Sequence, residues 1–343
     1  MSEIKAEGPV LVCRDACRYY KKKEKRVHED GTLTRVSTVK AVDGVSLELA
    51  HGEILGVIGE SGCGKSTLGR LIVRLEKTSS GEVIVNGSNV EDLIRRDRLG
   101  FRRQVQMVFQ NPFDTFDPRL TVEKILIGTL RLHGIGKSDV ERHELALARL
   151  AAAGLLPAED FMKRFPHELS GGQLQRISIL RSMLLEPVVM VCDEPVSMLD
   201  VSIRADIINL IYETARAEHT AAVFISHDIT TTRYISDRIA VMYLGRIVEI
   251  GEANEVALHP QHPYTEALIS NCSSIDPREK KKAIALPGEP PSPVDIPPGC
   301  PFAPRCPRAD ASCSRHEQVL KETDSGHFVR CSKVTDGIET LTL

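Results

Sequence analysis

The stretch Gly59-Glu-Ser-Gly-Cys-Gly-Lys65-Ser66-Thr67 decides how this sequence folds, because it fits the pattern G-x-x-x-x-G-K-S/T. A strand pattern, Glu53–Ile58, precedes it, and a helical pattern, Thr67–Leu75, follows it. In such a unit the glycines let backbone N–H groups turn inward around the β- and γ-phosphates of a nucleotide. We therefore predict a P-loop, with Lys65 as the cation for ATP phosphates and Ser66 as a ligand of Mg²⁺. The predicted contacts are Gly59, Ser61, Gly62, Cys63, Gly64, Lys65, Ser66 and Thr67.

Short apolar runs on both sides of this loop predict strands that alternate with helices, which is typical of a mostly parallel α/β sheet. The predicted strands are Val45–Leu49, Glu53–Ile58, Glu82–Asn86, Val105–Phe109, Val188–Cys192, Ala221–Ser226 and Ile239–Leu244. From Thr121 to about Leu184 the pattern is helical instead. There, Ser138 and Glu141 form a capping box that opens a helix through Ala153. We therefore expect a helical subdomain, residues 111–186, inserted in an α/β core.

Composition excludes several classes of protein. The 343 residues carry a formal net charge of −3 and 4% aromatics with no Trp, which argues against a nucleic-acid binder. The basic runs Lys21–Arg26 and Lys280–Lys282 are interpreted as solvated loops. No apolar run reaches the ~18 residues of a membrane helix, and the N-terminus lacks a signal pattern. We expect a cytosolic protein, or one that is peripheral to a membrane on its cytosolic side.

The last part of the chain differs in composition from the rest. Eight prolines lie between Pro287 and Pro304, too many for a helix or a central strand. We therefore expect a nucleotide-binding domain at residues 1–270 and a separate C-terminal extension at residues 271–343.

Two carboxylates follow the strand Val188–Cys192, at Asp193 and Glu194. Asp193 is placed to hold the hydration shell of Mg²⁺, and Glu194 can polarise the attacking water as a general base. An apolar strand that ends in acids is a weak signal alone. Together with the P-loop it predicts ATP hydrolysis.

A second glycine-rich loop, Leu169-Ser170-Gly171-Gly172-Gln173, opens another predicted helix. Its N–H groups can bind another anion, which a single ATP site does not need. With this loop, the chain resembles the nucleotide-binding subunits of ATP-binding-cassette (ABC) transporters. The resemblance implies a RecA-like P-loop NTPase core with an antiparallel β edge. It also implies that the signature loop, Ser170, Gly171, Gly172 and Gln173, closes on ATP held by a second subunit.

The remaining motifs of that family occur in order. The resemblance places Tyr20, rather than Tyr19, as the aromatic side chain that stacks on adenine. It makes Gln110 the glutamine that senses Mg²⁺ and the attacking water, and it puts Asp200 in the loop that crosses the dimer interface. It makes His227 the switch histidine that contacts the γ-phosphate.

Two minor departures from the family pattern, Leu174 and Leu180, are interpreted as packing changes on the signature helix. The complete motif set implies an ATP-hydrolysing subunit with Lys65, Gln110, Glu194 and His227 as its catalytic side chains. Non-catalytic ABC cassettes and soluble ABC ATPases acting on ribosomes or DNA are less favoured readings.

Several stretches resemble one branch of the family, the second (F-type) ATPase of oligopeptide and dipeptide importers. They are Gly59–Arg70, Val108–Pro112, Asp193–Ser197, His262–Leu268 and Pro297–Cys306. This resemblance implies a peripheral protein of the inner membrane that pairs with a different ABC ATPase, two permease subunits and, indirectly, an extracytoplasmic binding protein. Related importers carry nickel, oligosaccharides or opines, so the cargo stays open. Phe113, Phe116 and Pro118 fit either a permease-docking groove or the core of the helical insertion.

Four cysteines, Cys300, Cys306, Cys313 and Cys331, crowd the extension, with five, six and seventeen residues between them. This spacing is not the C-x₂-C pairing typical of structural zinc, although four thiolates suit a 4Fe–4S cluster or a tetrahedral zinc. Some importer ATPases of the resembling branch bind a 4Fe–4S cluster in this tail. Zinc and unmetallated thiols or disulfides remain as alternatives.

Overall fold

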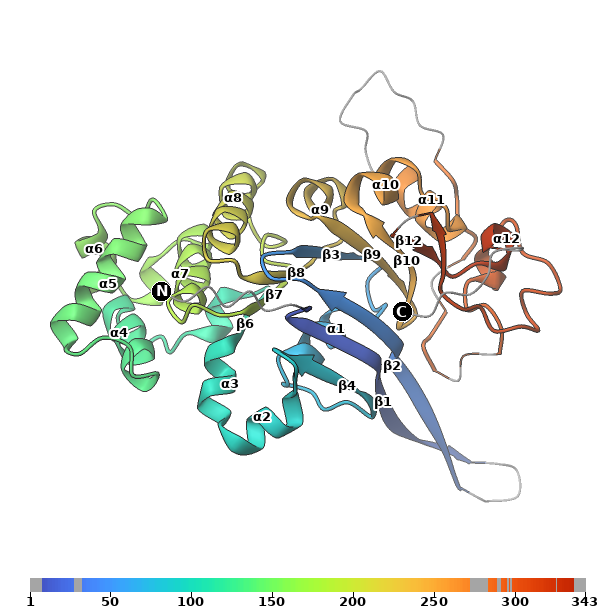
Figure 1. The fold of residues 1–343 in the computed structure, drawn as a ribbon, viewed down its shortest axis with the longest axis horizontal. Coiled ribbons are helices and arrows are strands. Elements are labelled where there is room, and N and C mark those ends of the chain that lie inside the picture. The colour runs from blue at the N-terminus through green and yellow to red at the C-terminus, as the bar shows by residue number, and fades with distance from the viewer. Residues whose placement is uncertain are drawn as a thin grey trace. The chain divides into compact units, whose positions relative to one another are not determined.

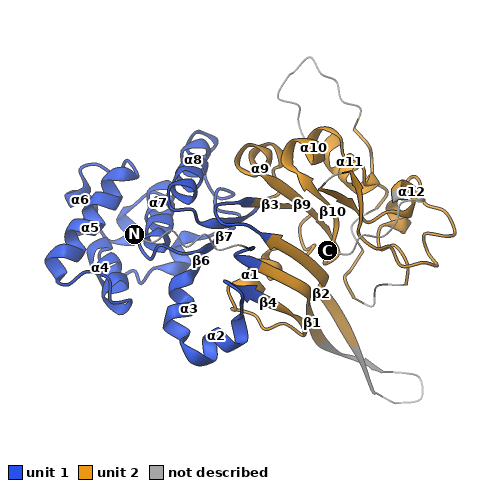
Figure 2. Cartoon of the chain, in the orientation of Figure 1, with its two compact units in different colours: residues 1–11, 49–54, 84–225 blue, residues 12–48, 55–83, 226–343 orange. Residues whose placement is uncertain are grey.

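The computed structural model describes residues 8–27, 33–271, 283–288, 291–294, 296, 298–324 and 326–335. The chain forms two compact units, each assembled from separate segments (Figure 2). Unit 1 comprises Met1–Leu11, Leu49–Ile54 and Ile84–Ile225, and unit 2 comprises Val12–Glu48, Leu55–Val83 and Ser226–Leu343. Neither unit begins or ends near Ser270. The boundary that we expect there between the nucleotide-binding domain and the C-terminal extension stays a prediction.

Unit 1 contains three neighbouring parallel strands, β6 (Val105–Val108), β7 (Val189–Asp193) and β8 (Ala221–Ile225). Val108 lies opposite Cys192, and Cys192 lies opposite Phe224. Every residue of β7 and β8 is buried, as expected for parallel strands covered on both faces. The predicted strands are therefore confirmed to within about a residue. Because the strands are parallel, the residues that follow β6 and β7 lie at one edge.

The helical region predicted from Thr121 is present in unit 1. Its helices are α4 (Val122–Leu132), α5 (Asp139–Ala152), α6 (Ala158–Lys163) and α7 (Gly171–Met183), with the 3-10 turns η1 (Pro112–Thr115) and η2 (Pro166–Glu168). Unit 1 also holds α2 (Val90–Arg96), α3 (Arg98–Gln104) and α8 (Val201–Ala217). The Ser138 hydroxyl caps α5 by accepting from the Glu141 N–H at 3.2 Å, as predicted. The Glu141 carboxylate, however, accepts from the Lys137 N–H rather than from Ser138.

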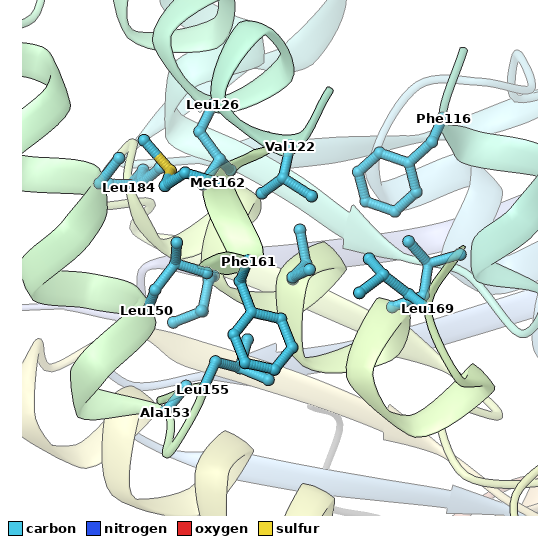
Figure 3. Packing of buried hydrophobic residues seen from close by; sticks show 14 of the residues in the cluster. Phe116, Val122, Leu126, Leu150, Ala153, Leu155, Phe161, Met162, Leu169 and Leu184 are labelled. Atoms are coloured by element: carbon cyan, nitrogen blue, oxygen red, sulfur yellow. The ribbon is translucent and has the colours of Figure 1, made fainter. Parts of the chain in front are cut away.

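A hydrophobic cluster joins the helices of this region, and Phe161 and Met162 contribute to it from α6 (Figure 3). Leu174 and Leu180 belong to the cluster, so their interpretation as packing residues is confirmed. Phe116 also belongs to it, with the Arg181 guanidinium 4.6 Å from the ring centre. Phe113 differs, because 49% of its surface is exposed. Of the two aromatics, only Phe113 is therefore available to a partner.

A four-stranded sheet has the order β2-β1-β4-β5. Its strands are β1 (Leu11–Val27), β2 (Leu33–Leu49), β4 (Ser80–Val85) and β5 (Ser88–Asn89), and β1 and β2 form a long ribbon in Figure 1. The loop predicted at Lys21–Arg26 is wrong, because β1 continues through these residues. A run of charged residues lacks the apolar alternation from which a strand is predicted. The run Lys280–Lys282 lies outside the described residues.

Unit 2 carries the parallel pair of β3 (Ile54–Ile58) and β9 (Arg238–Tyr243), followed by an antiparallel edge. The edge strands, in order from β9, are β10 (Arg246–Glu252), β12 (His327–Val329) and β11 (Lys321–Asp324). Val329 lies opposite Glu249. The C-terminal extension thus pairs with β10 and covers a strand edge that would otherwise be open. The proline-rich composition of the extension did not predict these strands.

The helices of unit 2 are α1 (Lys65–Ile72), α9 (Ile229–Ile235), α10 (Ala253–Leu258), α11 (Pro263–Ser270) and α12 (Ser332–Thr335), with the 3-10 turn η3 (Ala303–Arg305). A hydrophobic cluster of this unit combines β9 and α11 with Phe302 of the extension. The extension is therefore part of the core of unit 2.

Candidate active site

The P-loop connects β3 to α1 through residues with an unusual backbone. Gly59 and Gly64 have φ values of +151° and +107°, in the region that favours glycine. A Cβ atom would lie 2.3 Å from the Met242 carbonyl oxygen at Gly59 and 2.0 Å from that of Ala41 at Gly64. Both glycines are therefore required by conformation and by space, which supports the assignment of this turn as a phosphate cradle.

Lys65, the first residue of α1, folds back over this loop. Its Nζ donates to the carbonyl oxygens of Gly59 at 2.7 Å and Glu60 at 3.1 Å, and only 5% of the residue is exposed. The loop thus holds a buried cation, with the hydroxyl-bearing Ser66 next to it in the helix. Burial raises the pKa of the Cys63 thiol, which makes it a neutral packing group.

Glu194 stands directly after β7 in a strained conformation. Its φ is +47°, which is uncommon for a residue with a side chain and often marks a functional site. Its backbone N–H donates to the Ile225 carbonyl oxygen at 3.0 Å, which fixes the turn to β8. Asp193, the last residue of β7, is buried, whereas Glu194 is half-buried. The two neighbouring carboxylates therefore have different environments.

Gln110, two residues after β6, is hydrogen-bonded to Glu194. Its amide nitrogen donates to the Glu194 carboxylate and to the Ser197 hydroxyl, at 3.1 Å in each case. The Ser197 hydroxyl in turn donates to the Glu194 carbonyl oxygen at 3.1 Å. The sequence had suggested Gln110 and Glu194 from separate motifs, and the structure brings them together. From the sequence, Ser197 was named only as the last residue of the stretch Asp193–Ser197.

The signature loop opens α7 with a reciprocal capping box. The Ser170 hydroxyl accepts from the Gln173 N–H at 3.3 Å, and the Gln173 side chain accepts from the Ser170 N–H at 3.0 Å. A Cβ atom on Gly172 would lie 2.8 Å from Ile203 Cγ2, so the glycine lets α7 pack against α8. Ser170 is exposed at this helix N-terminus, where an anion is favoured.

The other predicted residues lie in or next to β1, β8 and α8. Tyr20 is half-buried in β1, with the Arg18 guanidinium 4.5 Å from its ring centre. The Tyr19 hydroxyl donates to Asp43, and burial together with this hydrogen bond raises the pKa of Tyr19. His227 follows β8 and is exposed. Asp200 is exposed where α8 begins.

The predicted site residues divide between the two units. Unit 1 contains Gln110, Ser170–Gln173, Asp193, Glu194 and Asp200, and unit 2 contains Tyr20, Gly59–Thr67 and His227 (Figure 2). Unit 1 therefore holds the candidate water-activating carboxylate and the signature loop, and unit 2 holds the phosphate cradle.

The four cysteines of the extension line one small cavity, together with His262, Phe302 and Lys333. Burial raises the pKa of Cys300, Cys306 and Cys331. No disulfide joins cysteines within the described residues. In the same part of the chain, no set of three or more His, Cys, Asp or Glu side chains is placed to hold a single metal ion. The thiols therefore share a cavity without converging on one point.

Residues 42–197 match the family described as ABC transporter, and residues 248–313 match the oligopeptide/dipeptide transporter, C-terminal region. The oligopeptide transport ATP-binding protein OppF of Escherichia coli is 46% identical over 299 residues, which cover 87% of this chain and 89% of OppF. The chain belongs to the ABC transporter family.

Two further comparisons extend over much of this ABC ATPase. The dipeptide transport ATP-binding protein DppF of Haemophilus influenzae is 40% identical over 330 residues, or 96% of this chain and 98% of DppF. The dimeric structure of the ATP-binding cassette MJ0796 bound to ADP and Pi has a TM-score of 0.61 and 27% identity, covering 71% of this chain and 98% of that chain. These matches confirm the P-loop NTPase fold of the ABC ATPases. Across the described parts of this ABC ATPase, no helix is both long and apolar enough to cross a membrane.

Proposed function

We propose that this ABC ATPase binds Mg·ATP at a dimer interface and powers the uptake of dipeptides or oligopeptides through partner membrane subunits. One observation carries the cargo assignment: the match to the oligopeptide/dipeptide transporter C-terminal region spans residues 248–313. The relatives named for peptide transport align over 87% and 96% of this chain.

The proposed chemistry assigns one task to each group. Lys65 and the P-loop N–H groups hold the β- and γ-phosphates, and Ser66 and Asp193 hold Mg²⁺. Glu194 accepts a proton from water while the water oxygen attacks the γ-phosphorus, and the bond to the β-phosphate oxygen breaks to release ADP. Gln110 orients the Glu194 carboxylate through its 3.1 Å hydrogen bond. His227 contacts the γ-phosphate, and Tyr20 stacks on adenine.

The signature loop supports the proposal that this chain supplies half of each ATP site. Ser170 and the exposed N-terminus of α7 form an anion-binding end that the chain's own P-loop chemistry leaves unused. The proposed partner is a second, different ABC ATPase, whose signature loop closes over the ATP on Lys65. Two permease subunits and, indirectly, an extracytoplasmic binding protein complete the importer. This chain then lies peripherally on the cytoplasmic face of the inner membrane.

The segment after Gln110 supports a permease-docking site. Phe113 is 49% exposed, and Pro118 and Leu120 beside it are exposed too. Phe116 packs in the core and serves as the matched control. A Phe113→Cys variant should cross-link to a permease subunit in membranes, and failure to do so in the assembled importer would count against this site.

Four cysteines that line one cavity support a 4Fe–4S cluster in the extension, and zinc remains the alternative. Cys300, Cys306, Cys313 and Cys331 would be its ligands, with a structural or regulatory role. Protein purified without oxygen should then contain iron and absorb near ~400 nm. A colourless, iron-free sample overturns the cluster.

Uptake by the reconstituted importer tests the main proposal. Labelled dipeptides and oligopeptides should accumulate in vesicles only with ATP, and nickel and oligosaccharides should not. Glu194→Gln should lower hydrolysis by ~100-fold or more and stop uptake while ATP binding remains. If an importer that hydrolyses ATP normally takes up nickel or a sugar instead, the peptide assignment is wrong. Unchanged turnover in Glu194→Gln would remove Glu194 as the base.

A further inference from the structure

Glu60, the second residue of the P-loop, is held by two groups from the C-terminal part of unit 2. Its backbone N–H donates to the Tyr264 hydroxyl at 2.9 Å. Its carboxylate accepts from both terminal nitrogens of Arg305, Nη1 at 2.8 Å and Nη2 at 3.0 Å. The extension therefore contacts the phosphate cradle directly, across a separation of 245 residues in the sequence.

The pair between Arg305 and Glu60 is not an ordinary surface ion pair. Only 7% of the Arg305 side chain and 26% of the Glu60 side chain are exposed. Both Arg305 nitrogens bond to separate carboxylate oxygens, which is the two-pronged geometry that a guanidinium can form and an ammonium cannot. A paired, desolvated contact of this kind is screened less by salt than an exposed one.

Aromatic packing fixes the position of Arg305. Phe302, three residues earlier, lies with its ring centre 5.3 Å from that of Tyr243 and 5.4 Å from that of Tyr264. These two tyrosines are themselves 4.7 Å apart and fully buried. The short turn η3 then places Arg305 on Glu60. The same aromatic group thus orients both partners of Glu60, the Tyr264 hydroxyl and the Arg305 guanidinium.

Glu60 is the only acidic residue in the loop Gly59–Thr67. An unpaired carboxylate at this position would repel the phosphates that the neighbouring N–H groups bind. Arg305 compensates that charge through its two hydrogen bonds to the carboxylate. Because the Glu60 side chain is only 26% exposed, water compensates its charge only in part when Arg305 is removed.

We propose that Arg305 is a positioning residue for nucleotide binding. By pairing with Glu60 it neutralises the acidic side chain of the P-loop. The C-terminal extension thereby sets the affinity of this ABC ATPase for Mg·ATP.

Calorimetric titration of the full-length chain with Mg·ATP provides the first measurement. Arg305→Ala should weaken binding by roughly tenfold, the scale of one unscreened charge near a phosphate. In the reconstituted importer it should raise KM for ATP by a similar factor and leave kcat within about twofold, since Glu194 is untouched. Arg315→Ala removes an exposed arginine of the same extension and should change neither value. If Arg305→Ala binds ATP as tightly as Arg315→Ala, the proposal is overturned.

A double variant distinguishes neutralisation of the Glu60 charge from a purely structural support of the loop by Arg305. Glu60→Gln added to Arg305→Ala removes the unpaired charge and should restore ATP affinity to within about twofold of wild type. Arg305→Lys keeps the charge but loses the two-pronged contact, and should restore part of the affinity. A double variant as weak as Arg305→Ala would overturn the proposal. Should Arg305→Ala fail to fold, Glu60→Gln alone decides: it should bind ATP at least as tightly as wild type, and tenfold weaker binding overturns the idea.

Discussion

The P-loop and the signature loop are both glycine-rich turns that lead into the N-terminus of a helix, yet they are built differently. In the P-loop, Gly59 and Gly64 take left-handed backbone conformations that other residues avoid. In the signature loop, the chain enters α7 through extended backbone at Ser170, and neither Gly171 nor Gly172 has a positive φ. Its order comes from side chains instead, through the capping box with Gln173.

The difference shows which loop can bind a nucleotide by itself. The P-loop combines inward-turning backbone with a buried cation, Lys65, which is what a polyphosphate needs. The signature loop, Leu169–Gln173, contains no cationic residue and offers only a helix N-terminus and a hydroxyl. Such a group adds to a phosphate already held elsewhere. The two loops are therefore suited to unequal tasks, primary binding and closure over ATP on a second subunit.

Removal of the Lys65 ammonium group should have the largest effect, and it tests whether the P-loop binds the nucleotide by itself. Lys65→Ala should weaken Mg·ATP binding by ~100-fold or more, because the phosphates lose a desolvated charge-assisted contact. Titration of the purified chain with Mg·ATP measures it. Lys77→Ala, an exposed lysine of the same unit, is the control and should bind as wild type does. Tight binding by Lys65→Ala would mean that backbone N–H groups suffice and that the contrast with the signature loop is false.

Distortion of the signature loop should lower hydrolysis by the assembled importer and leave ATP binding by the isolated chain nearly unchanged. Gly172→Val forces side-chain atoms into Ile203 of α8, where even a Cβ would lie at 2.8 Å, and should shift the start of α7. Hydrolysis by the assembled importer should fall by roughly 30-fold, a loss of about 2 kcal/mol in the transition state. ATP binding by the isolated chain should stay within about twofold.

Gly128→Val supplies the control for that variant, because it places the same side chain in α4 where nothing lies within 4 Å of the added Cβ. It should leave hydrolysis unchanged. If Gly172→Val weakens ATP binding by the isolated chain as strongly as it weakens hydrolysis, the signature loop serves the chain's own ATP.

Much of the candidate site could be predicted because its signals are local. A strand, a glycine-rich turn and a helix are contiguous around Lys65, and the β7 strand leads directly to Asp193 and Glu194. The parallel pairing of β6 and β7 then brings Gln110 to Glu194, as two neighbouring strands require. The helical region from Thr121 and the Ser138 cap of α5 were also predicted from local patterns.

The features that the sequence did not predict depend on contacts between distant residues. Lys21–Arg26 lies in β1, which is a neighbour of β2 in the sheet. A run of charged residues does not predict such a strand. The strands β11 and β12 are short, and only the open edge of β10 explains why they form. The bond from Arg305 to Glu60 joins residues 245 apart, and nothing in either segment indicates that it contacts the other. Such contacts follow from the folded sheet rather than from any one segment.

The smallest effect, and the most selective test of the signature loop, comes from its cap. Ser170→Asp keeps an N-cap acceptor for the Gln173 N–H, so the free energy of unfolding should change by less than about 0.5 kcal/mol. The added charge, however, would face the phosphate of a partner-bound ATP, and hydrolysis in the importer should fall by about tenfold. Ser138→Asp makes the same replacement at the cap of α5 and should affect neither quantity. If Ser170→Asp hydrolyses ATP as Ser138→Asp does, this helix N-terminus meets no phosphate, and the signature loop only organises α7.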